Sequence, residues 1–173
     1  MVDFSKGSSA SLDLRSYITD IPDFPIDGIT FKDIQPLLSN TKAFKQAIYE
    51  MFSKFKTKMD YWAGIDSRGF IFASGLSHFS NKGLKLIRKG GKLPPPTVTK
   101  TYDLEYGNDT IEIQPGKGKV VIVDDVYATG GTMDAAEQLC NEAGYDVVGK
   151  VVFIDLAFLH GPTDVKSIIK YEA

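Results

Sequence analysis

Two adjacent aspartates, Asp124 and Asp125, precede a short loop that is rich in glycine and threonine, residues 127–132. Such carboxylates can accept hydrogen bonds from the hydroxyl groups of a sugar, or they can hold the water shell of a divalent cation. Gly130 and Gly131 allow the backbone to adopt positive φ and to approach a ligand closely. These residue types, in this order, are suited to binding a phosphorylated sugar.

The elements on either side place this loop where an anion can bind. Val120–Val123 is an apolar, β-branched run, typical of a strand covered on both faces in a parallel sheet. Apolar residues then repeat at helical spacing over residues 133–143, and Gly144 is suited to ending that helix. A helix start offers unpaired N–H groups and the positive end of the helix dipole, so we expect a monophosphate to bind there. The residues expected to hold it are Ala128, Thr129, Gly130, Gly131 and Thr132.

Other common nucleotide-binding patterns are absent from the sequence. It contains neither the Walker pattern G-x-x-x-x-G-K-[ST] nor the dinucleotide pattern G-x-G-x-x-G. The net charge of −2, from 20 basic and 22 acidic residues, gives no reason to expect nucleic acid or an anionic membrane as a partner. Two histidines, His78 and His160, are too few to favour a zinc site built from histidine. Any anion site must therefore be local.

The composition is typical of one soluble globular domain. The chain has 173 residues, of which 43% are hydrophobic and 24% charged, and we expect a single domain over residues 1–173. The one cysteine, Cys140, falls on the apolar side of its predicted helix, so we interpret it as a core residue in a reducing compartment. The sequence has no apolar leader and no run of about 18 apolar residues, so we expect a cytoplasmic protein.

A second strand-to-helix turn has anion-binding residues. Tyr61–Ile65 is predicted to be a buried strand, and Asp66-Ser67-Arg68-Gly69 follows it before a helix over residues 70–79. Backbone N–H groups and a guanidinium fork suit a diphosphate, although such turns are often only solvated. A short strand over residues 84–88 then leads into a basic loop rich in glycine and proline, residues 89–96. This loop either provides positive charge to bind a diphosphate or is only a solvated linker.

A predicted hairpin lies between two of these anion-binding elements in the sequence. Residues 97–103 and 110–114 alternate well enough to pair, and Leu104-Glu105-Tyr106-Gly107 lies between them near the tip. An exposed Glu-Tyr pair at a hairpin is normally unremarkable. This hairpin could also fold over the site as a lid that excludes water.

The segment over residues 21–34 contains two prolines and a turn at Asp27-Gly28, so we predict irregular, extended backbone. Such backbone can hydrogen-bond the edge of a planar heterocycle, and Phe31 could stack on its face. The residues alone favour the alternative that Phe24 and Phe31 only fill the core.

The remaining segments complete an α/β pattern. We predict a short helix over residues 11–19, an amphipathic helix over residues 40–58 and a buried strand over residues 147–154, while residues 164–173 give no prediction. This order predicts a parallel sheet with right-handed crossovers, to which the hairpin and the N-terminal segment add a roof.

Four motifs resemble those of the type I phosphoribosyltransferases. Val-Asp-Asp-x-x-Ala-Thr-Gly-Gly-Thr, residues 123–132, resembles their ribose-5-phosphate-binding signature. Pro-Asp-Phe-Pro-x-x-Gly-Ile-x-Phe-Lys-Asp-Ile, residues 22–34, is similar to the N-terminal signature of the adenine-specific branch. Arg-Lys-x-Gly-Lys-Leu-Pro over residues 88–94 and Leu-Glu-Tyr over residues 104–106 also look like motifs of this family. The resemblance covers about residues 20–160.

The resemblance implies a parallel-sheet fold with a flexible loop and hairpin hood over about residues 89–115 and a base-covering segment over about residues 1–35. The implied reaction joins adenine to 5-phosphoribosyl-1-pyrophosphate and gives AMP and pyrophosphate. Magnesium would be held mainly by the pyrophosphate donor and, through water, by Asp124 or Asp125. A homodimer is implied as well, with neither nucleic acid nor membrane as a partner.

Roles for single residues follow from the same resemblance. Glu105 would act in catalysis, Asp124 and Asp125 would bind ribose, and residues 128–132 would bind the 5-phosphate. Adenine would contact Phe31, Lys32 and Leu156, with Phe31 and Leu156 on its two faces. The pyrophosphate group would be bound by Asp66, Ser67, Arg68, Arg88, Lys92 and Tyr106. In this family the Asp66–Ser67 peptide bond is expected to be cis.

The sequence departs from the family pattern at two places. Pro95-Pro96 replaces a usual glycine after Pro94 and should stiffen the exit from the basic loop, and Tyr127 stands where an aliphatic residue is usual. Two other classes remain as alternatives. One is a related transferase for hypoxanthine, guanine or orotate, and the other is a non-catalytic regulator that binds phosphoribosyl groups and DNA.

Overall fold

The computed structural model describes residues 11–104 and 107–172, which form two compact units divided between Ala47 and Ile48. The larger unit contains a seven-stranded sheet with the strand order β5-β6-β4-β3-β7-β8-β9. The strands are β3 Tyr61–Ile65, β4 Gly83–Lys89, β5 Val98–Leu104, β6 Gly107–Ile113, β7 Gly118–Tyr127, β8 Tyr145–Leu156 and β9 Lys166–Tyr171.

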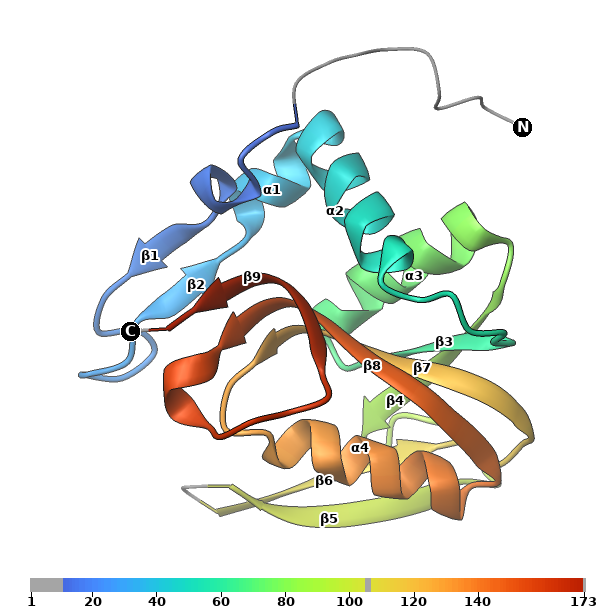
Figure 1. Cartoon of the computed structure of the whole chain (residues 1–173). Coiled ribbons are helices and arrows are strands. Elements are labelled where there is room, and N and C mark those ends of the chain that lie inside the picture. Colours follow the sequence, from blue (N-terminus) through green and yellow to red (C-terminus); the bar gives the residue numbers. More distant parts are fainter. Residues whose placement is uncertain (1–10, 105–106, 173) are drawn as a thin grey trace. The chain divides into compact units, whose positions relative to one another are not determined.

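The strands β4, β3, β7, β8 and β9 are parallel, whereas the hairpin β5–β6 joins β4 antiparallel. The predicted α/β fold with a parallel sheet is therefore confirmed, as is the predicted hairpin. Helix α3, Arg68–Ser80, connects β3 to β4, and helix α4, Gly131–Glu142, connects β7 to β8. The two helices lie on opposite faces of the sheet (Figure 1).

Burial on both faces explains the apolar run in β7. Residues Val120–Val123 have no exposed surface. On one face Phe72 of α3 stacks against Phe153 of β8, with ring centroids 5.4 Å apart. On the other face α4 buries Leu139 and Cys140 in the core. The prediction that Cys140 is a core residue is confirmed, and burial raises the pKa of its thiol to about 12.

The hairpin is packed against α4 along most of its length. Ile111 and Ile113 of β6 belong to the same buried cluster as the apolar side of α4. Lys100 of β5 forms an ion pair with Glu142 at the end of α4, with 2.6 Å between Nζ and Oε1. The hairpin runs below α4 in Figure 1. The base of the predicted hood is therefore an integral edge of the sheet.

The smaller unit contains the 3₁₀-helix η1 Leu14–Tyr17, strands β1 Thr19–Ile21 and β2 Phe31–Asp33, helix α1 Gln35–Ser39 and the start of α2 Thr41–Ser53. Strands β1 and β2 pair antiparallel, with Thr19 opposite Asp33. The prediction of irregular backbone over residues 21–34 is thus wrong at both ends, because Ile21 and Phe31 pair in this small sheet.

Several predicted boundaries differ from the structure. The helix predicted over residues 40–58 ends at Ser53, where Lys54 and Phe55 make tighter i→i−3 hydrogen bonds and Phe55 packs against Trp62. The helix predicted over residues 11–19 is the single turn η1. The C-terminal segment, for which no structure was predicted, adds β9 to the sheet. No helix in the described ranges is long and apolar enough to cross a membrane.

Candidate functional site

Three neighbouring strands end at the same edge of the larger sheet. Strand β3 pairs with β7, and β7 pairs with β8, all in parallel register. The Asp66–Ser67 turn follows β3, the 128–130 loop follows β7, and Leu156 ends β8. Ligands of open α/β sheets bind at the carboxyl ends of the strands, so this edge is the candidate site.

The loop after β7 has the backbone conformation of an anion-binding turn. Gly130 adopts φ +98° at the N-cap of α4, and its carbonyl accepts the Asp134 N–H at 3.0 Å. Positive φ was predicted for both glycines, but Gly131 does not have it because it is the first residue of the helix. The N–H groups of the first helical turn have no partner inside the helix. This turn can therefore donate several hydrogen bonds to one anion.

Strand β7 extends further than predicted. It includes Asp124, Asp125 and Tyr127, which the sequence placed after the strand, because pairing with β8 continues as far as Tyr127 and Asp155. The two acids consequently have the fixed geometry of a strand. The Asp125 N–H donates to Oδ1 of Asp124 at 2.9 Å.

An arginine from the neighbouring turn contacts this acid pair. Nε of Arg68, at the start of α3, lies 2.8 Å from Oδ2 of the buried Asp125. Burial, together with the charge of Asp125, raises the pKa of Asp124 well above its usual value. Burial also raises the pKa of Asp125, although the Arg68 charge opposes that shift. Arg68, predicted for pyrophosphate, thus links its own turn to the predicted ribose-binding acids.

The turn after β3 has the expected cis peptide bond between Asp66 and Ser67, so that prediction is confirmed. Gly69 leaves no space for a side chain. A Cβ there would lie 2.7 Å from the Val123 carbonyl oxygen and 3.0 Å from Oδ1 of Asp124. Glycine at this position lets α3 start directly against β7. The Asp66–Gly69 turn and the acid pair are therefore adjacent.

The basic loop is tied down at several points. Nε of Arg88 lies 3.3 Å from Oδ2 of Asp66. Nη1 of the same arginine donates to the Lys92 carbonyl at 3.3 Å. Oε1 of Glu112 accepts the N–H groups of Lys92 and Leu93, each at 2.6 Å. The Leu93 N–H bond is the main reason that the pKa of Glu112 is lowered. The structure therefore brings together Asp66, Arg88 and Lys92, all predicted for pyrophosphate.

Glu112 was not identified from the sequence. It alternates with Ile111 and Ile113 along β6, so its pattern is that of any strand residue facing away from the core. Its side chain is nevertheless buried, with only 3% of the residue exposed. No local signal in the sequence indicates that its carboxylate binds the backbone of a loop about 20 residues away.

The remaining predicted residues are distributed between the units and outside the described ranges. In the smaller unit, Phe31 packs edge-on against Phe24, with centroids 5.3 Å apart, and Nζ of Lys32 pairs with Asp20 at 2.7 Å. In the larger unit, Leu156 is half-buried at the end of β8. Glu105 and Tyr106, predicted for catalysis and for pyrophosphate, lie outside the described residues.

A separate hollow of about 630 Å³ opens near the amino ends of β7 and β8. Its lining includes Lys58, Lys82 and Lys119 together with Asp60 and Asp146. The mixed charges and the position at the other end of the strands separate it from the glycine loop and the acid pair. We therefore assign the chemistry to the carboxyl ends of the strands.

Comparisons with known proteins agree with this geometry. Residues 32–169 match the model of the phosphoribosyl transferase domain. The class is defined by a set of parallel strands in which β7 carries two adjacent acids near its carboxyl end and is followed by a glycine-capped helix start. The chain belongs to the phosphoribosyltransferase family.

The most similar proteins share a narrower name. The adenine phosphoribosyltransferase of Bdellovibrio bacteriovorus is 48% identical over 165 residues, covering 92% of this chain and 100% of the relative. The crystal structure of the enzyme from Thermoanaerobacter pseudethanolicus is 40% identical, covers 91% of this chain and 98% of its own, and has a TM-score of 0.84. The Saccharomyces cerevisiae enzyme, solved with an iminoalditol bisphosphate and adenine, is 35% identical over 84% of this chain and 88% of its own, with a TM-score of 0.79. Within the family, this chain belongs with the adenine phosphoribosyltransferases.

Proposed function

We propose that this chain transfers the 5-phosphoribosyl group of 5-phosphoribosyl-1-pyrophosphate to adenine, giving AMP and pyrophosphate. One observation carries the proposal: Asp124 and the buried Asp125 are adjacent near the end of β7, and a glycine-capped helix start follows this strand. The acid pair is suited to sugar hydroxyls and the helix start to a phosphate, so together they match the two polar ends of a ribose 5-phosphate.

The 5-phosphate binds in the loop formed by Ala128, Thr129, Gly130, Gly131 and Thr132. Backbone N–H groups at the start of α4 donate to its oxygens, and the helix dipole favours its negative charge. The hydroxyls of Thr129 and Thr132 add two side-chain donors. Gly130 provides the positive φ that turns the chain into the helix at this point.

The ribose is held by Asp124 and Asp125, whose carboxylates accept hydrogen bonds from the 2- and 3-hydroxyls. Arg68 keeps a positive charge beside Asp125 and so offsets part of the cost of burying two neighbouring carboxylates. Holding both ends of the sugar fixes the position of C1 relative to the incoming base. Positioning of this kind can lower a barrier by about 7–11 kcal/mol.

The departing pyrophosphate is bound by Ser67, Arg68, Arg88 and Lys92, with Asp66 orienting Arg88 and with Tyr106 as a further ligand. When the C1–O bond breaks, negative charge accumulates on the pyrophosphate. The positive charges of Arg68, Arg88 and Lys92 stabilise it. The ribosyl centre becomes positively charged at the same time. The attacking base nitrogen must already be aligned behind C1.

A magnesium ion bound with the donor would supply further positive charge beside the pyrophosphate. The described part of the chain has no group of three histidine, cysteine or acidic side chains that could hold a metal by itself. Asp124 and Asp125 do supply carboxylate oxygens of the kind that hold a hydrated magnesium ion. The residues therefore fit an ion held mainly by the donor, with these acids as partners through water.

Phe31, Lys32 and Leu156 are the adenine-binding residues of this proposal, and the backbone around Lys32 hydrogen-bonds the polar edge of the base. Glu105 handles the proton on the purine or counters its positive charge as the new bond forms. We also propose that the chain acts as a homodimer. Sedimentation equilibrium tests the dimer, and a monomer at working concentration would contradict it.

Turnover of adenine, hypoxanthine, guanine and orotate with the same donor tests the reaction. We expect product from adenine alone, and equal turnover of another base would replace the substrate assignment. Replacing Glu105 by alanine should reduce kcat much more than donor binding, with Glu142→Ala as the control on the helix surface. Unchanged kcat would remove Glu105 from catalysis.

A crystal structure with AMP tests the binding residues directly. We expect its phosphate in the 128–132 loop and its ribose hydroxyls on Asp124 and Asp125. A nucleotide bound elsewhere would overturn these assignments while leaving the reaction itself intact.

A further inference from the structure

Tyr127 lies against the proposed 5-phosphate loop. A Cβ placed on Gly130 would lie only 2.7 Å from the Tyr127 hydroxyl, so the hydroxyl packs against the backbone of Gly130. The ring itself is buried, with 8% of the residue exposed. An aliphatic side chain has no polar atom to place at this contact.

His160 holds the other side of this ring. Its imidazole packs edge-to-face on Tyr127, with centroids 4.6 Å apart and an interplanar angle of 76°. Nε2 lies 2.7 Å from Oδ1 of Asp155, and Nδ1 lies 2.6 Å from the Gly161 carbonyl oxygen. A carboxylate and a carbonyl both accept hydrogen bonds, so each ring nitrogen of His160 lies where an N–H of the imidazole can donate.

The charged groups around His160 come from two strands. Asp155 at the end of β8 supplies a partner carboxylate, and Lys170 of β9 opposes the positive charge. Burial lowers the pKa of His160, but the hydrogen bonds to Asp155 and Gly161 and the charge of Asp155 together outweigh burial, so the net pKa is raised. The direction agrees with the geometry of the two ring nitrogens.

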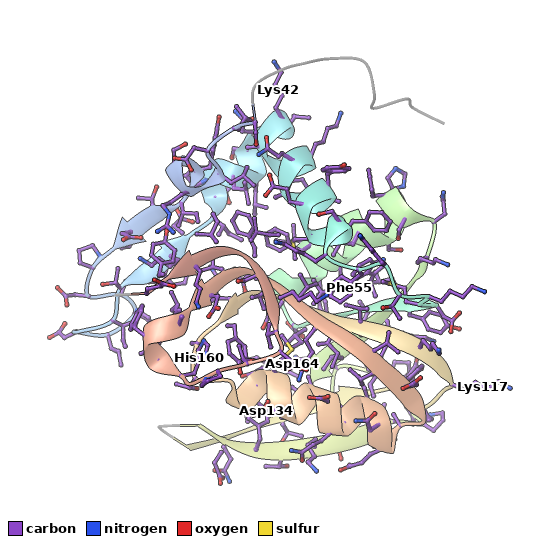
Figure 2. The ribbon with its side chains drawn as sticks, in the orientation of Figure 1. Lys42, Phe55, Lys117, Asp134, His160 and Asp164 are labelled. Atoms are coloured by element: carbon purple, nitrogen blue, oxygen red, sulfur yellow. The ribbon has the colours of Figure 1, made fainter. Side chains whose placement is uncertain are left out.

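The segment over residues 160–164 is fastened at its other end as well. Oγ1 of Thr163 lies 3.4 Å from the Tyr127 hydroxyl. Asp164 pairs with Nζ of the buried Lys150 at 2.8 Å, and the same Nζ pairs with Glu137 of α4 at 2.6 Å. Figure 2 shows His160 and Asp164 on this segment, beside α4. The segment therefore has fixed contacts to β7, β8 and α4.

These contacts form a continuous series from Asp155 through His160 and Tyr127 to Gly130. Each of these residues is buried or makes two polar contacts, so these contacts fix the position of the Tyr127 hydroxyl. We propose that Tyr127 and His160 are positioning residues, which hold the Gly130 end of the loop in the conformation that binds the 5-phosphate. The inference rests on the proposed function, since it takes the 128–132 loop as the phosphate site.

Two separate ligands distinguish positioning from general stability. Ribose 5-phosphate would use the loop after β7, whereas pyrophosphate with magnesium would use the residues after β3 and β4. We expect Tyr127→Phe and His160→Gln each to raise the dissociation constant for ribose 5-phosphate by about five- to tenfold. Each substitution weakens the contacts that hold the loop by about the free energy of one hydrogen bond. The dissociation constant for pyrophosphate should stay within about twofold.

Isothermal titration calorimetry of the full chain with each ligand provides the measurement. Tyr145→Phe is the matched control for the tyrosine, because its hydroxyl is also buried and donates to the Gln114 carbonyl at 3.1 Å, near the start of β8. His78→Gln is the control for the histidine, since His78 is exposed in the last turn of α3. Neither control should change ribose 5-phosphate binding. In steady-state assays, Tyr127→Phe should raise KM for the donor and leave kcat within about twofold.

The outcomes separate this inference from the proposed site. Equal weakening of both ligands, or no weakening of either, in Tyr127→Phe and His160→Gln overturns the inference. If His160→Gln does not fold, Tyr127→Leu, which places an aliphatic residue here, decides the matter by the same criteria. A double variant Thr129→Ala, Thr132→Ala tests the loop itself. If that variant binds ribose 5-phosphate normally, the proposed phosphate site is wrong, whatever Tyr127 and His160 do.

Discussion

The two regions at the carboxyl edge of the sheet that we propose to bind anions are built in different ways. The loop after β7 gains its shape from backbone conformation, with Gly130 at φ +98° resting on the buried ring of Tyr127. The region after β3 and β4 gains its shape from charged side chains, with Arg88 on Asp66 and Glu112 on the basic loop. One region is an extension of the core, and the other is a set of polar contacts between charged side chains and a loop.

The difference has a physical reason in the reaction. Substrate and product both carry the 5-phosphate, so a rigid arrangement of backbone donors can bind this group throughout turnover. Pyrophosphate must arrive with the donor and leave as product. Long cationic side chains can follow a group whose charge and position change. The comparison predicts that small changes in backbone or packing damage the first region, while changes in charge damage the second.

The largest effect is expected from Gly130→Ala. A Cβ there would meet the Tyr127 hydroxyl at 2.7 Å, and the positive φ is itself unfavourable for alanine. We expect the kcat/KM for the donor to fall by about 100-fold, which corresponds to about 2.7 kcal/mol. Steady-state kinetics with varied donor measure it, and Gly161→Ala, where a Cβ has open space, is the control.

A double variant sharpens this prediction. Tyr127→Phe removes the atom that a Cβ at residue 130 would contact first, so part of the loss should be recovered in Gly130→Ala combined with Tyr127→Phe. Residues in contact give non-additive effects of about 0.5–3 kcal/mol. Strict additivity of the two substitutions would show that the Tyr127 hydroxyl does not constrain Gly130.

The second effect concerns the charged region. Glu112→Gln keeps the size of the side chain but removes the charge that binds the N–H groups of Lys92 and Leu93. We expect about a tenfold increase in KM for the donor, because hydrogen bonds to a charged group contribute about 1.5–3 kcal/mol. Glu142→Gln on the surface of α4 is the control. An unchanged KM would mean that the basic loop keeps its position without this carboxylate.

The pH dependence of the same contact has a definite sign. The backbone N–H bonds lower the folded-state pKa of Glu112, with the Leu93 bond as the largest cause. A lowered pKa gives stability that is present above the unfolded-state pKa of about 4.3 and is lost as the pH falls through the folded-state value. The difference in thermal stability between the native chain and Glu112→Gln should therefore shrink below about pH 4. Thermal unfolding followed by circular dichroism measures it.

The contrast between the regions also explains what the sequence could predict. The run Val120–Val123, the acids and the glycines form one local pattern, so the strand, the helix start and the phosphate loop follow from neighbouring residues. Asp66-Ser67-Arg68-Gly69 is likewise a local pattern. The family resemblance predicted the cis peptide bond between Asp66 and Ser67. The parallel sheet follows from the alternation of such strands and helices.

What the sequence could not predict depends on distant partners. Glu112 binds a loop about 20 residues away, and His160 contacts Tyr127 of a different strand. Strand β9 has no clear pattern of its own and is stabilised by pairing with β8. The short strands β1 and β2 form because Ile21 and Phe31 are brought together across a turn. In each case the tertiary contact, rather than the local sequence, determines the structure.

A third and smaller effect should follow from the titration of His160. Burial lowers the pKa of His160, but the hydrogen bonds to Asp155 and Gly161 and the charge of Asp155 together raise it above the usual 6.5. A raised pKa in the folded state gives stability that is fully present below the unfolded-state pKa and is lost as the pH rises through the folded-state pKa. We expect Tm of His160→Gln to be lower than that of the native chain at pH 6, with a smaller difference at pH 9. A constant difference would show that the imidazolium charge does not contribute.

The smallest effect is expected where an ion pair lies on the surface away from both regions. Lys100 pairs with Glu142 at 2.6 Å, but the two side chains keep 28% and 48% of their surface exposed. Exposed pairs contribute about 0–1 kcal/mol, because water screens the charges and both side chains lose entropy. We expect Lys100→Met to change the free energy of unfolding by less than about 0.5 kcal/mol and to leave donor KM unchanged. Urea unfolding and steady-state kinetics measure the two quantities. A large loss of donor affinity would mean that the hairpin carrying Lys100 controls the site through its contact with α4, and the separation between core-built and charge-built regions would then fail.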